Sequence, residues 1–128
     1  MARCWPGPLT LVLPARADLP PALTGGSGRI GVRISSHPVA QALVKALGEP
    51  ITATSANPGG SPPALDVATA QAYFGTHVAY VEGGRLAGGL GSTVLLVADD
   101  AARVIRRGAT SIDELRRVLG STPLHIES

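Results

Sequence analysis

The chain has 128 residues, which is the size of one domain and enough to bury a hydrophobic core. Its net charge of +2 does not by itself indicate a nucleic-acid partner, and with 3% aromatic residues the core must consist mainly of Val, Ile, Leu and Ala. A single cysteine, Cys4, excludes an internal disulfide and a cysteine-based zinc cluster, and it favours a reducing, cytoplasmic setting.

The N-terminal region imitates a secretory signal, because an apolar run is followed by the small-x-small sequence Ala15-Arg16-Ala17. The run itself, Leu9–Leu13, is too short for export and lies between Pro8 and Pro14, so we predict a buried strand there. No segment approaches the ~20 apolar residues of a membrane span, and we expect no membrane partner.

The next apolar segment, residues 30–34, alternates in hydrophobicity and predicts a second strand, with Arg33 on the face opposite the apolar side chains. An arginine there is either a solvated edge residue or a clamp for an anionic ligand. The overlapping stretch Gly26–Gly31 spells the dinucleotide-binding pattern G-x-G-x-x-G, which must follow a strand and open a helix. Here it precedes a strand, so we assign it no function.

Three segments have the caps and apolar spacing of helices. The first begins at Ser36 and ends before Gly48, and its apolar residues recur along one face. A weaker helix runs from about Asp66, its N-cap, to residue 74. The last begins with a capping box at residues 111–114 and ends at residue 120.

The stretch Ile51–Gly60 combines a short β-branched strand with a turn forced by Pro-Gly-Gly. At its end Ser55 and Asn57 present a hydroxyl, an amide and backbone N–H groups, a set that suits an anionic or polar ligand. The alternative is an ordinary turn in which Asn57 bonds its own backbone.

Further strands are predicted at residues 78–81, 92–97 and 103–106, where apolar runs lie between glycine-rich or acidic turns. Strands and helices therefore intermix along the chain. This order predicts a single α/β domain over residues 1–120 with a mixed sheet and flanking helices, followed by a tail at residues 121–128.

Polar side chains stand at the ends of these apolar strands: Thr10, Arg33, Ser55, Asn57, Ser92 and Arg106. Each has an ordinary structural explanation alone, but together they predict a pocket of hydroxyl and guanidinium groups for phosphates and a small carboxylate. A serine hydrolase built on Ser55 is disfavoured because the G-x-S-x-G elbow is missing. The three histidines lack metal-binding spacing, so we predict no metal site.

Five blocks of sequence, in order, resemble the threonylcarbamoyl-adenylate synthase family of YrdC-like domains. They are Trp5–Thr10, Gly31–Ile34 with His37-Pro38, Thr54–Pro58, Gly91–Val94 and Ile105-Arg106. The resemblance implies a twisted α/β sheet with a positively charged concave cavity. It also implies a nucleotidyltransferase that forms threonylcarbamoyl-AMP and pyrophosphate from L-threonine, bicarbonate and ATP, with Mg²⁺ accompanying the ATP, for the threonylcarbamoyladenosine of tRNA.

By the same resemblance Arg33 would bind the threonine carboxylate and Ser92 would also contact the amino acid. Ser55 and Asn57 match the family's S-x-N motif and would face the nucleotide phosphates, with Thr10 and Arg106 also on the ATP side. No catalytic residue is assigned, because adenylyl transfer depends on positioning and charge stabilisation more than on a covalent nucleophile.

The chain departs from the family at its beginning. It starts at what resembles the middle of the domain, without the K-x-R motif that grips the phosphates, and its only lysine, Lys45, is not in such a motif. An arginine such as Arg29, or a second subunit, could replace that lysine. A partial domain would expose sheet edges that favour self-association. The alternative function is an inactive RNA-binding or assembly module that acts on tRNA or on other tRNA threonylcarbamoylation proteins.

Overall fold

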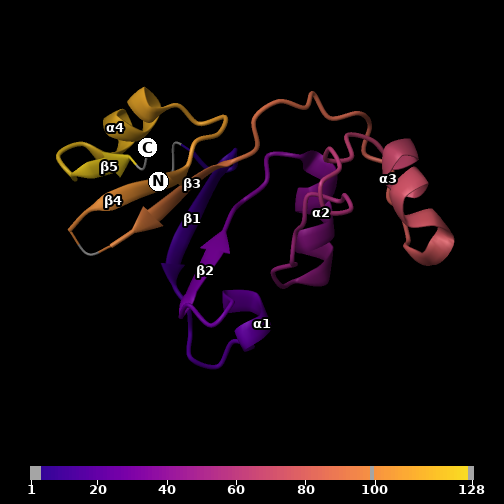
Figure 1. Cartoon of the computed structure of the whole chain (residues 1–128), viewed down its shortest axis with the longest axis horizontal. Helices are drawn as coiled ribbons and strands as arrows, with labels where there is room; N and C mark the ends of the chain where they lie inside the picture. Colours follow the sequence, from indigo (N-terminus) through magenta and orange to yellow (C-terminus); the bar gives the residue numbers. More distant parts are fainter. Residues whose placement is uncertain (1–3, 99, 127–128) are drawn as a thin grey trace. The chain divides into compact units, whose positions relative to one another are not determined.

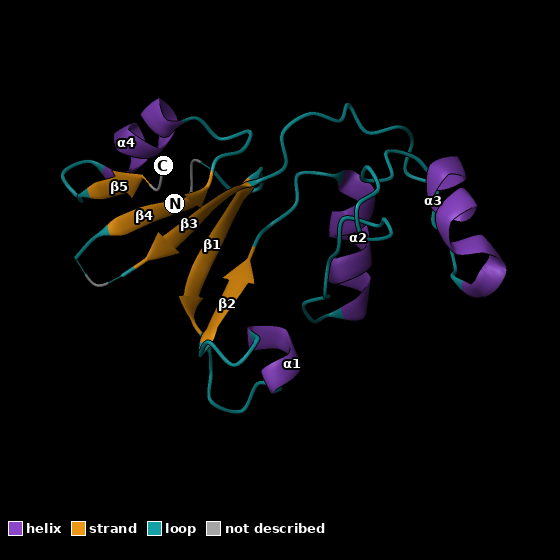
Figure 2. Ribbon diagram, in the orientation of Figure 1, coloured by secondary structure: helices purple, strands orange, loops and turns teal. Residues whose placement is uncertain are grey.

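The computed structural model describes residues 4–98 and 100–126 (Figures 1 and 2). In chain order the elements are β1 (Leu9–Pro14), α1 (Pro21–Thr24), β2 (Arg29–Val32), α2 (Pro38–Leu47), α3 (Val67–Phe74), the 3-10 helix η1 (Gly75–His77), β3 (Thr93–Val97), β4 (Ala102–Arg106), α4 (Ile112–Leu119) and β5 (Leu124–Ile126). Most of the strands and helices predicted from the sequence are present within one or two residues of their expected bounds.

The chain divides into two compact units, and each is described by itself. The sheet unit comprises Met1–Gln41 and Leu90–Ser128, and the helix unit comprises Ala42–Gly89. The five strands of the described residues all belong to the sheet unit, and α3 belongs to the helix unit. That residues 1–120 form one domain stays a prediction.

The sheet has five strands in the order β2-β1-β3-β4-β5. The pairs β1·β2 and β3·β4 are antiparallel, whereas β1·β3 and β4·β5 are parallel. With its flanking helices this mixed sheet confirms the predicted α/β fold class.

One face of the sheet forms the core, because alternate residues of each strand point the same way. Its fully or nearly fully buried apolar side chains are Cys4, Leu9, Leu11, Leu95, Ala102, Val104 and Leu115. Leu115 comes from α4, which lies on this face and adds half-buried residues at positions 112, 118 and 119. The apolar residues of α4 recur at i, i+3 and i+6, which places one face of the helix against the sheet.

Two of the helices begin with the N-cap residue that the sequence predicts. The Ser111 hydroxyl accepts a 3.2 Å hydrogen bond from the Glu114 amide at the start of α4. The Asp66 carboxylate accepts a 2.8 Å bond from the Thr69 amide at the start of α3, and Arg85 forms an ion pair with the same carboxylate. These bonds satisfy backbone donors that a helix N-terminus otherwise leaves unpaired.

Three expectations about the secondary structure were wrong. Residues 51–54 and 78–81 form no strand, although both contain β-branched residues, because the described chain provides no neighbouring strand for them. Residues 124–126, predicted to lie in a tail, form β5 and pair with β4 at the edge of the sheet. The rest of the predicted tail is not described at residues 127–128.

In the described ranges no helix is long and apolar enough to cross a bilayer. Cys4 is a free thiol in the core, as a chain with one cysteine requires. Burial, together with the nearby Glu114 charge, raises the pKa of this thiol, which favours its protonated form.

The Asp66 cap predicts an acid-sensitive helix. Hydrogen bonds from Thr69, and then the charge of Arg85, hold the pKa of Asp66 below its usual value of 3.8. The stabilisation is therefore present above pH 3.8 and is lost as the pH falls through the lower pKa of the folded state. We expect Asp66→Ala to accelerate hydrogen exchange of the Thr69 amide at neutral pH, whereas Asp66→Asn, which can still cap, leaves it nearly unchanged. If the Thr69 amide exchanges at the same rate in the wild type and in Asp66→Ala, the Asp66 side chain does not cap α3.

Candidate functional site

Three predicted site residues converge at one end of the sheet although they are far apart in the sequence. Thr10 in β1 and Arg106 in β4 both pair with Val94 of β3, from opposite sides. Ser92 directly precedes β3. The strand register alone therefore brings these three side chains into one place.

Their side chains are hydrogen-bonded to one another. The Thr10 and Ser92 hydroxyl oxygens lie 2.7 Å apart. Arg106 donates from Nη2 to the Ser92 carbonyl at 2.9 Å and to the Ser92 hydroxyl at 3.3 Å. Thr10 and Ser92 are half-buried and Arg106 is exposed, so the cluster keeps a solvent-facing guanidinium above two oriented hydroxyls.

A β-bulge aims Arg106 into this cluster. Leu95 pairs with Val104, but the next pair is Val94 with Arg106, which leaves Ile105 as an extra residue in β4. In a regular strand without the bulge, Ile105 would pair with Val94 and Arg106 would share the core face with Val104. The bulge turns it to the face that carries Thr10, which is a common use of bulges near functional sites.

Buried hydroxyls join the backbone segments beneath the cluster. The Thr93 hydroxyl donates to the Thr110 carbonyl at 2.7 Å, and the Thr110 hydroxyl donates to the Pro8 carbonyl at 3.1 Å. The Thr93 amide donates to the same Pro8 carbonyl at 2.9 Å. These bonds tie together the segments that carry Thr10, Ser92 and Arg106, and Thr93 and Thr110 are only 0% and 4% exposed.

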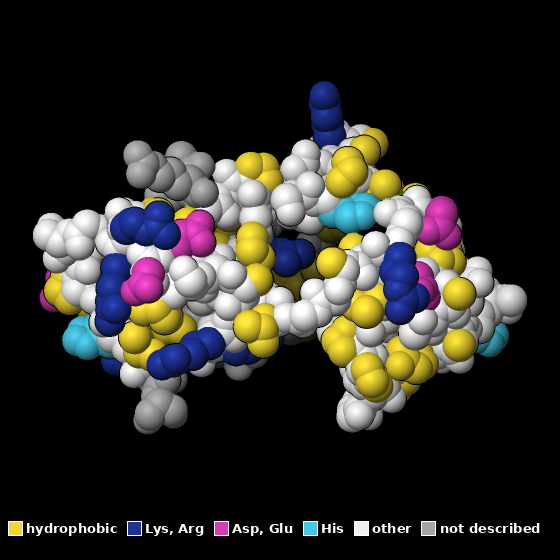
Figure 3. Space-filling model, turned by 90° about the horizontal axis from the view of Figure 1, so that it is seen from above, with side chains coloured by type: hydrophobic (Ala, Val, Ile, Leu, Met, Phe, Trp, Pro, Cys, Tyr) yellow, Lys and Arg dark blue, Asp and Glu magenta, His cyan; other side chains and the backbone are white. Residues whose placement is uncertain are grey.

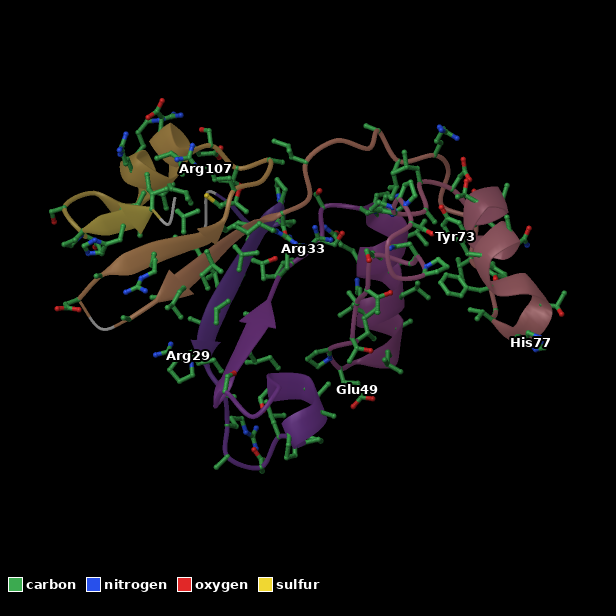
Figure 4. All side chains as sticks on the ribbon, in the orientation of Figure 1. Arg29, Arg33, Glu49, Tyr73, His77 and Arg107 are labelled. Atoms are coloured by element: carbon green, nitrogen blue, oxygen red, sulfur yellow. The ribbon has the colours of Figure 1, made fainter. Side chains whose placement is uncertain are left out.

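Arg33 lies at the same end of the sheet. It follows the last residue of β2, and β2 runs antiparallel to β1 with Val32 opposite Leu11. The Gly7 amide donates to the Ile34 carbonyl at 2.9 Å, which ties the chain after β2 to the turn before β1. Figure 4 shows Arg33 near the point where β1 begins and β2 ends. Its side chain is exposed and available to an anionic ligand.

Ser55 and Asn57 belong to the helix unit and form a turn there. Ala56, between them, has a positive φ of 52°, a conformation that non-glycine residues seldom adopt. The Asn57 amide nitrogen donates to the Pro58 and Ser61 carbonyls at 3.0 and 2.9 Å. Asn57 thus supports the turn, as the alternative interpretation expected. Its Oδ1 is nevertheless buried without a hydrogen-bond partner, and Ser55 is exposed.

Two other basic residues do not belong to the cluster of Thr10, Ser92 and Arg106. Arg29 pairs with Pro14, at the opposite end of β1 from Thr10, so it lies away from this cluster. That it replaces the missing lysine stays a prediction. Lys45 is exposed in the last turn of α2. Within the described ranges no group of three His, Cys, Asp or Glu side chains could hold a metal ion.

The chemistry of Thr10, Ser92, Arg106 and the nearby Arg33 is suited to binding and not to nucleophilic catalysis. A serine nucleophile needs a neighbouring base, whereas Ser92 contacts a threonine hydroxyl and a guanidinium, neither of which accepts a proton at neutral pH. Two hydroxyls and two arginines supply hydrogen bonds and positive charge for phosphate and carboxylate groups. Such an arrangement can hold anionic groups in fixed positions.

Sequence reasoning missed the residues that support the cluster. Gly108 packs so closely on the backbone of residues 91–93 that a Cβ atom would collide with it, and Thr93 and Thr110 are buried hydroxyls. The sequence signal for this support was Gly108, two residues after Arg106, followed by Thr110. It was weak, because such a pattern is equally typical of an ordinary loop.

Comparison with known proteins identifies the family. The sequence profile of the Sua5/YciO/YrdC family, described as telomere recombination, matches residues 1–108. Threonylcarbamoyl-AMP synthase of Bacillus subtilis is 39% identical over 129 residues, a match that covers 99% of this chain and 37% of that protein. Threonylcarbamoyl-AMP synthase of Halorhodospira halophila is 46% identical over 84 residues, which are 66% of this chain and 44% of that protein. The chain spans less than half the length of these relatives.

Solved structures agree with the sequence comparison. The crystal structure of Pyrococcus abyssi Sua5 complexed with L-threonine matches 97% of this chain and 37% of its own with a TM-score of 0.87 and 33% identity. Escherichia coli YciO matches 89% of this chain and 56% of its own, with a TM-score of 0.76 and 32% identity. A profile match over most of the chain, relatives above 35% identity and two superposable structures agree: this chain belongs to the Sua5/YciO/YrdC family.

Proposed function

We propose that this chain is part of a threonylcarbamoyl-AMP synthase. It is similar to relatives that carry this name and to a Sua5 structure that contains L-threonine. The observation that carries the proposal is the hydrogen-bonded cluster of Thr10, Ser92 and Arg106 with Arg33 at the same end of the sheet. A site of this kind can bind a small carboxylate and phosphates side by side.

In the proposed reaction the threonine amino group attacks the carbon of bicarbonate, and water leaves to give a carbamate. A carbamate oxygen then attacks the α-phosphorus of ATP, the bond to the β-phosphate oxygen breaks, and pyrophosphate departs. Mg²⁺ enters with ATP as part of the substrate. Both steps need close approach of negatively charged groups, so positioning and positive charge are the main contributions that the protein has to make.

The proposed roles follow from the site. Arg33 binds the threonine carboxylate through its planar fork, and Ser92 contacts the amino acid. Arg106 and Thr10 act on the ATP side. Because Arg106 and Thr10 are both hydrogen-bonded to Ser92, the amino-acid and nucleotide positions are mechanically linked.

The proposed roles of Ser55 and Asn57 concern the nucleotide phosphates. Their turn presents an exposed hydroxyl next to a residue held at positive φ. The unpaired Asn57 Oδ1 is compatible with a further donor in the complete site. The product would pass to the proteins that modify tRNA in the cytoplasm, the location that the single cysteine favours.

The first test is pyrophosphate release by the 128-residue chain with Mg-ATP and bicarbonate, with and without L-threonine. Arg33→Ala is expected to raise the KM for threonine roughly 10- to 100-fold, the effect of losing a charge-assisted hydrogen bond. The matched control is Arg16→Ala, because Arg16 is an exposed arginine that pairs with Asp18 on a loop. An equal change in both variants would remove Arg33 from the site.

A second function is supported by the exposed arginines at positions 33, 106 and 107. It is a non-catalytic RNA-binding or assembly module. This proposal replaces the enzyme proposal if the folded chain releases no pyrophosphate in response to threonine and binds tRNA with an affinity that falls steeply with salt concentration.

A further inference from the structure

The chain leaves the sheet directly after Arg106. This residue is the last of β4, and its pair with Val94 ends the ladder between β3 and β4. The bulge at Ile105 lies one residue before it, and a bulge disrupts the ladder bonds around it. The position of Arg106 therefore depends on bonds that the segment after β4 makes.

Three hydrogen bonds attach that segment to the chain at the starts of β1 and β3. The Ala109 amide donates to the Gly91 carbonyl at 2.9 Å. The Thr93 hydroxyl donates to the Thr110 carbonyl at 2.7 Å, and the Thr110 hydroxyl donates to the Pro8 carbonyl at 3.1 Å. Thr110 is therefore the residue at which bonds to both strands meet.

The Thr110 hydroxyl is not needed to satisfy its acceptor. The Pro8 carbonyl already accepts a 2.9 Å bond from the Thr93 amide. Thr110 is 4% exposed, so its side chain can affect a bound ligand only through its neighbours. A buried hydroxyl costs free energy unless it is bonded, and here its bond attaches the segment after β4 to the start of β1.

Arg106 is a side chain whose orientation depends on such an attachment. Figure 3 shows Lys and Arg side chains in dark blue on the surface of the part of the molecule that carries α4. An exposed arginine populates several rotamers unless other groups hold it. Arg106 is exposed, and its Nη2 donates to the Ser92 carbonyl at 2.9 Å and to the Ser92 hydroxyl at 3.3 Å. Both bonds require the end of β4 to stay in place beside the start of β3.

We propose that Thr110 is a positioning residue that keeps Arg106 bonded to Ser92 and oriented for the nucleotide phosphates. It acts through the backbone, because its hydroxyl fixes the segment after β4 and that segment fixes the last residue of the strand. The part of this inference that concerns the nucleotide rests on the proposed function. The part that concerns the order of the Arg106 side chain does not.

The first measurement needs no ligand. It is the NMR order parameter of the Arg106 Nε–H group in the full chain. We expect it to fall below about 0.6, the range of flexible groups, in Thr110→Val, and to stay near the wild-type value in Thr110→Ser, which keeps the hydroxyl. Thr24→Val is the matched control, because the Thr24 hydroxyl also donates to a proline carbonyl, that of Pro21 at 3.3 Å, but on α1. It should leave the order of Arg106 unchanged.

The second measurement is the affinity for Mg-ATP by calorimetry in two backgrounds. Thr110→Val should lower the affinity of the otherwise wild-type chain roughly 10-fold, the effect of weakening a charge-assisted hydrogen bond. In Arg106→Ala the same change should lower it less than twofold, since the side chain to be positioned is gone. A purely structural role of Thr110 would instead lower the affinity by the same factor in both backgrounds.

Four results would overturn the proposal. One is an Arg106 side chain that is as mobile in the wild type as in Thr110→Val. Another is an equal loss of order in Thr110→Val and in Thr24→Val. A third is an equal loss of ATP affinity in both backgrounds. The fourth is a chain that folds with neither Thr110→Val nor Thr110→Ala, which would make Thr110 a requirement of the fold itself.

The two measurements separate this inference from the proposed function. If the wild-type chain binds no ATP, the proposed nucleotide site fails, whereas the order of Arg106 still decides whether Thr110 positions it. If the chain binds ATP and the order of Arg106 is the same in the wild type and in Thr110→Val, the proposed function stands and the positioning role of Thr110 fails.

Discussion

Replacing Gly108 with alanine is expected to destabilise the sheet unit by about 3 kcal/mol or more, the upper range for overpacking against a rigid neighbour. A Cβ atom at this position would lie within 3.0 Å of backbone atoms of Gly91, Ser92 and Thr93. Because these are backbone atoms at the start of β3, no side-chain rotation can make room. The Ala109 amide, which donates to the Gly91 carbonyl at 2.9 Å, would have to move with them.

The measurement is thermal and urea unfolding of Gly108→Ala, in which we expect Tm to fall by roughly 10 °C or more. Gly59→Ala is the matched control, since Gly59 has no neighbour within 4 Å and no left-handed φ. Its effect should stay within about 0.5 kcal/mol, the range of ordinary surface substitutions. If both variants unfold at the same temperature, the close packing of residue 108 on β3 does not exist in solution.

Much of the sheet unit could be predicted from the sequence. An apolar run between two prolines identified β1, alternation identified β2, and a capping box identified α4, because these signals depend on neighbours in the sequence. In the helix unit a carboxylate cap identified α3 in the same way. The same local logic placed Thr10, Ser92 and Arg106 at strand ends. That these three ends meet depends on the pairing of β1, β3 and β4, which no local pattern encodes.

The failures have physical causes. Residues 51–54 and 78–81 have strand propensity, but a strand requires a partner, and the described chain offers them none. β5 was missed because three residues carry too little periodicity to distinguish a strand from a loop. The bulge at Ile105 was invisible because it is defined by the register between β3 and β4. It is also the feature that decides which way Arg106 points.

Self-association through the sheet edges remains a prediction. The edge strands are β2 and β5, with four and three residues. Strands this short offer few unpaired backbone groups, and short edges are a common protection against edge-to-edge pairing.

Arg106 carries the largest expected effect on binding, because it has two separable tasks in the proposed site. Its guanidinium supplies charge for the nucleotide phosphates, and its Nη2 holds the Ser92 carbonyl and hydroxyl at 2.9 and 3.3 Å. Arg106→Ala removes both tasks, so the affinities for ATP and for L-threonine should each fall roughly 10- to 100-fold. Stability should change little, since the side chain is exposed.

Arg106→Lys separates the two tasks. A lysine keeps the positive charge but lacks the planar fork that bonds two oxygens at once. ATP affinity should therefore recover most of its loss, whereas threonine affinity should stay low because Ser92 is no longer held. The matched control is Arg107→Ala, an exposed neighbour that Figure 4 shows near α4 and away from Arg33. Calorimetric titration with each ligand gives the two affinities separately. If Arg106→Lys restores both ligands equally, Arg106 acts by charge alone and its bonds to Ser92 do not link the two positions.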